Sequence, residues 1–228
     1  MQTLKGDQSL VMSYLTLRKV IGVMGAALPF VMPIGGLVIF RTGLQISISA
    51  YYWTGMRDVF VGILWAIGFF LLSYRGYEEK DDFAGNLGCL FAIGMALFPT
   101  TPATDPSELA MWIGGIHFGF AAAFFVTLIY FSAVLFTKTN PDFSMTDRKR
   151  QRNNVYRGCA VVMGLCIALL IIYVLLPAGT RTALDVVYPV FWLESAAIIA
   201  FGISWLTKGE AILADEEEPQ PAPSPAAD

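Results

Sequence analysis

Apolar runs of about 20 residues, separated by short polar or charged segments, dominate the chain. Runs of that length allow a helix to cross the roughly 30 Å hydrocarbon core of a bilayer. Only 14% of the 228 residues are charged, whereas soluble domains carry roughly a quarter. The runs do not alternate between apolar and polar residues, which excludes the strands of a membrane β-barrel. The sequence therefore predicts an all-α polytopic membrane protein.

Six apolar runs predict a six-helix transmembrane bundle over residues 18–208. A lead of residues 1–17 precedes it, and the acidic, Pro/Ala-rich tail of residues 209–228 is expected to be disordered. The third run is short and has to borrow flanking residues or lie buried among other helices. The expected spans are residues 20–40, 57–75, 86–98, 110–137, 157–176 and 187–206.

The distribution of basic residues predicts the orientation of the bundle. Six spans place both termini on the same side of the membrane. With the N-terminus inside, twelve of the fifteen Lys and Arg residues are cytoplasmic, and only Arg41, Arg57 and Arg181 lie outside. Because cytoplasmic loops carry an excess of basic residues, we predict that both termini are cytoplasmic.

The most basic segment is a predicted loop that begins at Lys138 and ends at Arg157. We expect this segment to orient the protein and to contact anionic membrane lipids. Nothing in the composition favours nucleic-acid binding, and the oligomeric state stays open. All three cysteines lie in apolar runs, where cysteine behaves as a small hydrophobe. No Cys/His spacing indicates a metal site, and no cofactor is predicted.

Two features near the first span bear on local structure. Pro29 and Pro33 lie within it, and we interpret them as a packing kink, with a gating hinge as the alternative. Residues 41–56 form the first outer loop. Polar and apolar residues alternate in its middle, which predicts an extended segment lying in the membrane interface.

Charged or titratable residues inside the spans are few, and burying them in lipid is costly. His117 and Glu194 each lie seven positions into a span that enters from outside. At 1.5 Å per residue, both should lie roughly 10 Å below the outer surface. Arg57 and Asp58 open the second span on the same side. The sequence therefore predicts that these four residues can form one cluster in the outer half of the bundle.

Small and aromatic residues supply the expected surroundings of this cluster. Gly115 and Gly119 flank His117 in a GxxxG arrangement, which allows helices to approach closely. Aromatic side chains could form the walls of an outward-facing pocket; the candidates are Tyr51, Tyr52, Tyr188 and Trp192.

Several interpretations of the cluster stay open. It can be purely structural, or it can bind a lipid headgroup or small ligand, with Arg57 engaging the anionic group. A membrane-embedded hydrolase would use His117 as a general base, oriented by Asp58 or Glu194. A zinc hydrolase needs several histidines, and the chain has one.

A proton-coupled transporter is the third functional possibility. It needs a polar path through the inner half of the bundle, where the sequence offers only Asn86, Thr127 and Tyr130. Binding without catalysis is therefore the preferred function.

Short motifs resemble a group of uncharacterised bacterial six-span membrane proteins. They are YY at 51–52, RDVFVG at 57–62, YRGY at 74–77, ALFP at 96–99 and SWL at 204–206, together with His117 and Glu194. The resemblance covers the six spans but neither end of the chain. It implies a six-span fold in the bacterial inner membrane and no particular activity.

Overall fold

The structure is a computed structural model that describes residues 2–74, 79–138 and 145–214. Those residues form helices and no strand, which confirms the all-α prediction. The α-helices are α1 (Gln2–Phe40), α2 (Arg57–Leu72), α3 (Glu79–Leu97), α4 (Glu108–Tyr130), α5 (Asp147–Leu175), α6 (Ala178–Asp185) and α7 (Pro189–Lys208). A 3₁₀ segment, η1 (Ser49–Trp53), precedes α2, and a π-helical segment, η2 (Phe131–Leu135), continues α4.

Four helical segments are long and apolar enough to cross a membrane. The other two long helices, α2 and α3, do not meet the same criteria of length and apolar composition. Helix α2 has 16 residues, a length of about 24 Å, and α3 begins with four charged residues, EKDD. The structure thus supports a transmembrane protein with four candidate spans among the described residues. The four segments are Tyr14–Phe40, Glu108–Leu135, Asp147–Leu175 and Pro189–Lys208.

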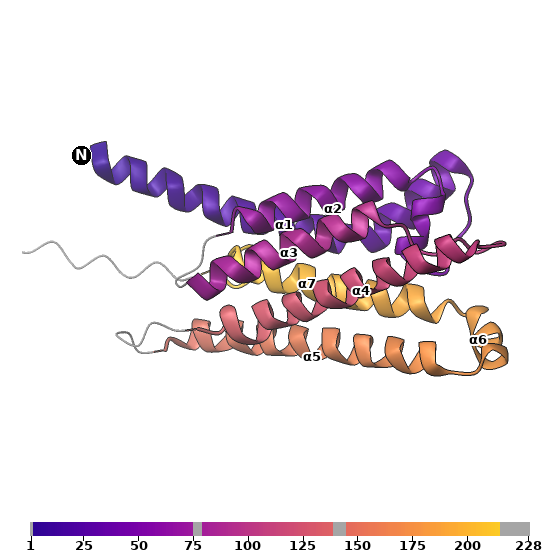
Figure 1. The fold of residues 1–228 in the computed structure, drawn as a ribbon. Coiled ribbons are helices and arrows are strands. Elements are labelled where there is room, and N and C mark those ends of the chain that lie inside the picture. Colours follow the sequence, from indigo (N-terminus) through magenta and orange to yellow (C-terminus); the bar gives the residue numbers. More distant parts are fainter. Residues whose placement is uncertain (1, 75–78, 139–144, 215–228) are drawn as a thin grey trace, which may run out of the picture.

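The long helices run back and forth along one common axis (Figure 1). Helix α7 packs between α1 and α5, α2 packs on α3, and α4 joins α3 to α5. We call one end of the bundle the α6 end; it carries residues 41–56 and 98–107 and helix α6. The opposite end, where α2 ends, α5 begins and α7 ends, is the Lys208 end (Figure 1).

Small residues hold α1 against α7. A Cβ atom added at Gly202 would lie 2.6 Å from Ala26 Cβ and 2.8 Å from the backbone oxygen of Gly22. A Cβ at Gly22 would in turn lie 2.8 Å from the backbone nitrogen of Leu206. The two backbones are therefore in direct contact, as small residues permit in membrane helices.

Several helix boundaries differ from the predicted ones. Helix α1 begins at Gln2, so the expected lead of residues 1–17 is continuous with the first helix, which also continues through Pro29 and Pro33. Helix α3 begins at Glu79 and not near residue 86. The extended segment predicted in the first outer loop is wrong at its end, where η1 forms a 3₁₀ turn.

Most of the predicted basic loop is helical. Helix α5 starts at Asp147 because the Thr146 hydroxyl accepts a hydrogen bond from the backbone N–H of Lys149 at 3.1 Å. A threonine in that position satisfies one of the unpaired donors of the first helical turn. Residues 209–214 of the expected tail pack against the end of α7, where the Ala211 N–H donates to the Leu206 carbonyl at 2.9 Å. Residues 215–228 lie outside the described residues.

The GxxxG prediction is also wrong. A Cβ at Gly115 or Gly119 would meet no atom within 4 Å among the described residues. The neighbouring Gly114 makes the close contact instead, because its face of α4 packs against Thr101 in the segment that follows α3.

Candidate functional site

Arg57 and Asp58 lie exposed at the start of α2, at the α6 end. The Arg57 Nε–H donates to the Tyr52 carbonyl at 2.9 Å. Its guanidinium lies 4.8 Å from the centre of the Tyr52 ring and 5.9 Å from that of Trp53. Within the described residues Arg57 forms no ion pair with Asp58 or Glu194. A cation resting on aromatic rings at a helix end is typical of a membrane-interface anchor.

His117 is buried on α4 and bonds to the end of α3. Its Nδ1 lies 2.7 Å from the Phe98 carbonyl oxygen and 3.2 Å from that of Met95. Both partners are acceptors, so Nδ1 carries the proton and donates. The ring therefore satisfies carbonyls left over at a helix C-terminus, and no carboxylate among the described residues bonds to it.

Glu194 lies half-buried on α7, and its Oε2 accepts a hydrogen bond from the Ile48 N–H at 2.7 Å. Ile48 is the residue before η1, so the carboxylate caps that turn. Glu194 also lines a cavity of about 50 Å³ whose other walls are mainly apolar side chains of α1, α2, α4 and α7. A cavity of that size has room for a few waters and is far below the roughly 300 Å³ of a small ligand pocket.

The aromatic candidates lie in different environments. Tyr51 is fully buried in η1, where burial raises the pKa of its phenol. Trp192 is 58% exposed and packs on Phe191 with the ring centres 5.0 Å apart. Tyr188 directly precedes α7 and has a left-handed backbone conformation, with φ of 52°. His117 and Glu194 both bond to segments near the α6 end, but no hydrogen bond or ion pair joins any two of the four predicted cluster residues.

Removing the Glu194 carboxylate is expected to loosen η1. In Glu194→Leu the Ile48 N–H loses its acceptor, and an unsatisfied buried donor costs about 1–3 kcal/mol. Glu194→Gln keeps a carbonyl oxygen at the same place and should preserve the bond. Amide hydrogen exchange at Ile48 checks this, with faster exchange expected in the leucine variant alone. Equal protection in all three proteins would show that the bond does not hold η1.

The densest group of charges lies at the opposite, Lys208 end. We call the group of charges there the cationic cluster. Its basic members are Arg18 of α1, Lys138 after η2, Lys149 and Arg152 of α5, and Lys208 of α7; its carboxylates are Asp81 of α3 and Glu210. Lys138 Nζ lies 2.8 Å from Asp81 Oδ1, and Arg152 lies 3.8 Å from Glu210. The cluster thus brings five basic and two acidic side chains together.

Lys208 is the centre of the cationic cluster and is 7% exposed. The charges of Arg18, Lys149 and Arg152 repel its ammonium, and that of Asp81 attracts it. Within the described part of the chain, the Lys208 ammonium has no hydrogen bond and no ion pair. Arg18 likewise has a buried Nε without a hydrogen-bond partner there.

Aromatic rings support the cations of the cluster. The Arg18 guanidinium lies 5.6 Å from the centre of the Tyr74 ring, and the Lys208 ammonium lies 5.4 Å from that of Phe136. The segment η2 ends just before Phe136, whose carbonyl accepts a hydrogen bond from Lys149 Nζ at 2.9 Å. Such cation–π contacts hold a charge in place without neutralising it.

Sequence reasoning did not identify this cluster. It placed Lys208 at the edge of the last span, Arg18 before the first and Asp81 in a loop, because each lies at the boundary of an apolar run. The available signal was the concentration of basic residues on one side of the predicted bundle. Burial at the meeting point of α1, α3, α5 and α7 depends on how the helices pack, which the residue pattern alone does not give.

The described residues contain no group of three or more His, Cys, Asp and Glu side chains able to hold a metal ion. The site is therefore characterised by its charges, aromatic rings and burial. Comparisons of the chain with family models, with curated proteins and with solved structures found no match.

Proposed function

We propose that this protein is a six-span membrane protein that binds a phosphate-bearing anion in the cationic cluster at its cytoplasmic end. The back-and-forth course of the six long helices supports six spans (Figure 1). Twelve of fifteen basic residues would then lie on the side of the Lys208 end, which indicates cytoplasmic termini. The motif resemblance further supports the bacterial inner membrane as its location.

The observation that carries the proposal is the buried ammonium of Lys208, which has no hydrogen bond and no ion pair among the described residues. Burying a charge without a partner costs several kcal/mol, so buried charges are normally paired. Here three further cations surround Lys208, and Asp81 is already bonded to Lys138. An anion with several oxygen acceptors would relieve the repulsion and accept charge-assisted hydrogen bonds, which are the strong class.

Binding at this end is better supported than at the α6 end. Arg57, the cation expected to engage an anionic group, is exposed and directed onto Tyr52. The cavity beside Glu194 is too small for a ligand larger than a few waters. We therefore keep the lipid headgroup as a candidate ligand, as expected from the sequence, and propose that it binds at the cytoplasmic end.

Titration with inorganic phosphate tests the proposal. The purified protein, in an uncharged detergent at constant ionic strength, should bind phosphate and gain thermal stability. Lys208→Gln should weaken binding about tenfold or more, since a hydrogen bond to a charged group contributes about 1.5–3 kcal/mol. Lys208→Arg keeps the charge and should bind nearly as the wild type does.

Arg150→Gln is the matched control, because it removes the same charge from the exposed side of α5. It should leave phosphate binding unchanged. The proposal would be wrong if the wild type bound no phosphate, or if Arg150→Gln and Lys208→Gln weakened binding equally.

A further inference from the structure

We infer that the cavity beside Glu194 binds a small ammonium-class cation, of the size of ammonium or methylammonium, as the counter-ion of that carboxylate. This site is separate from the anion site proposed at the Lys208 end and goes beyond it. The cavity has a volume of about 50 Å³, which is room for a few waters and therefore for an ion of similar size. Residues of α1, α2, α3, α4 and α7 line it, together with Ile48 and Ser49 at the start of η1.

Glu194 has no cationic partner in the described part of the chain. Its Oε2 accepts the hydrogen bond from the Ile48 N–H at 2.7 Å, and no charged side chain described in the structure acts on it. Arg57, the cation expected nearby, is exposed and rests on Tyr52. Buried charges in proteins are normally paired. Because Glu194 lines a cavity, a cation held in that cavity can supply the missing charge.

Aromatic side chains form much of the cavity wall. Four phenylalanines line it, all of them buried: Phe60, Phe124, Phe125 and Phe201. A cation over the face of an aromatic ring is attracted by the π-system, more strongly when the cation has lost its water. One carboxylate surrounded by several aromatic rings is typical of sites that recognise an ammonium group.

The same walls disfavour a metal cation. Mg²⁺ and Ca²⁺ take about six or more oxygen ligands, whereas Glu194 and Ser49 are the only described residues of the cavity wall with an oxygen-bearing side chain. An ammonium ion needs fewer oxygens, because it can donate to the carboxylate and rest the remainder of its charge on the rings. The walls therefore select a weakly hydrated cation.

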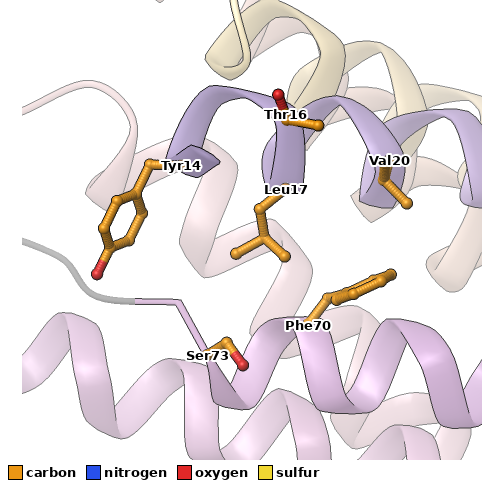
Figure 2. A pocket seen from close by; sticks show the side chains of 6 residues that line it. All are labelled: Tyr14, Thr16, Leu17, Val20, Phe70 and Ser73. Atoms are coloured by element: carbon orange, nitrogen blue, oxygen red, sulfur yellow. The ribbon is translucent and has the colours of Figure 1, made fainter. Parts of the chain in front are cut away.

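A larger hollow at the other end of α2 lacks this chemistry. The groove between α1 and α2 has a volume of about 540 Å³. Figure 2 shows Leu17 and Val20 of α1 pointing toward Phe70 of α2, with Ser73 nearby. None of the described residues that line the groove is charged, and none also lines the cavity. Phe70 thus provides a control: an aromatic ring beside a hollow without a carboxylate.

Binding of radiolabelled methylammonium to the purified protein in an uncharged detergent, at constant ionic strength, tests the inference. We expect saturable binding that ammonium displaces and sodium does not. Glu194→Gln keeps an oxygen for the Ile48 N–H but removes the charge, so binding should weaken about tenfold or more, as expected for the loss of a hydrogen bond to a charged group. Glu108→Gln removes the same charge from the exposed start of α4 and should leave binding unchanged.

Three results would overturn the inference. They are the absence of saturable binding to the wild type, displacement by sodium as effective as that by ammonium, and equal affinities of Glu194→Gln and Glu108→Gln. The phosphate affinity of Glu194→Gln should equal that of the wild type, so failure here leaves the proposed function intact.

A measurement on the unmodified protein locates the bound cation. In protein with labelled phenylalanine, the methyl protons of methylammonium should give nuclear Overhauser effects to the ring protons of Phe60, Phe124 and Phe201 and none to Phe70. Phe60→Leu removes one ring and should weaken binding about threefold or more, whereas Phe70→Leu should not. Overhauser effects to Phe70 alone, or none to the rings of the cavity, would show that the cation does not bind beside Glu194.

Discussion

Gly202→Leu is expected to abolish the folded bundle. The new side chain would meet the backbone oxygen of Gly22 and the backbone nitrogen of Ala26, at 2.8 and 2.9 Å from its Cβ. Backbone atoms in the middle of a helix cannot move aside as a flexible side chain can, so α1 and α7 have to separate. Overpacking by a few methylenes already costs about 1–3 kcal/mol, and this clash should exceed that range.

Thermal unfolding in detergent, followed by circular dichroism and size-exclusion chromatography, measures the effect. Gly119→Leu is the control, because a Cβ there meets no described atom within 4 Å. Leucine is also a better helix former than glycine by up to about 1 kcal/mol, so the control should be neutral or slightly stabilised. Similar melting temperatures for the two variants would contradict the close contact of α1 with α7.

Asp81→Asn is expected to destabilise the protein strongly and to make its stability depend on phosphate. Asp81 is 2% exposed and pairs with Lys138 at 2.8 Å. Removing one partner of a buried ion pair costs about 3–5 kcal/mol, and the 26% exposure of Lys138 places this pair toward the lower end of that range. The substitution also removes the attraction of Asp81 for the Lys208 ammonium, so added phosphate should stabilise this variant more than the wild type.

Asp147→Asn provides the comparison for Asp81→Asn. Asp147 pairs with Arg150 at 3.8 Å, and both side chains are largely exposed, so its loss should cost less than about 1 kcal/mol. Chemical unfolding with and without phosphate checks both variants. The account of the cluster fails if the two variants lose equal stability, or if phosphate gives Asp81→Asn no more stability than it gives the wild type.

The sequence predicted the fold class well and the helix ends less well. A helix that crosses the hydrocarbon core needs a continuous apolar run of about 20 residues. The prediction of an all-α membrane protein could therefore be made from composition and the length of these runs. The starts of α3 and α5 were placed too late because charged residues such as Asp81 and Arg152 interrupt the apolar pattern. Those residues are nonetheless helical and buried, since they pack against neighbouring helices at the Lys208 end.

The candidate site was predicted at one end, whereas the structure favours the other. Counting residues from the membrane surface placed His117 and Glu194 at a similar depth, and both do bond near the α6 end. Depth says nothing about which way a side chain points around its helix. Backbone groups of Phe98 and Ile48 are the partners of these side chains, and such backbone partners leave no signature in a residue pattern.

The distance between Lys208 Nζ and a bound phosphorus atom tests the central claim most directly. Solid-state NMR can measure it by ¹⁵N–³¹P dephasing on protein with ¹⁵Nζ-labelled lysine in phosphatidylglycerol-containing vesicles, with Lys208→Gln used to assign the signal. We predict strong dephasing of the Lys208 ammonium, as required by a phosphate oxygen at the roughly 2.7–2.9 Å of a charge-assisted hydrogen bond. An undephased Lys208 signal in fully lipid-loaded protein would contradict anion binding in the cationic cluster.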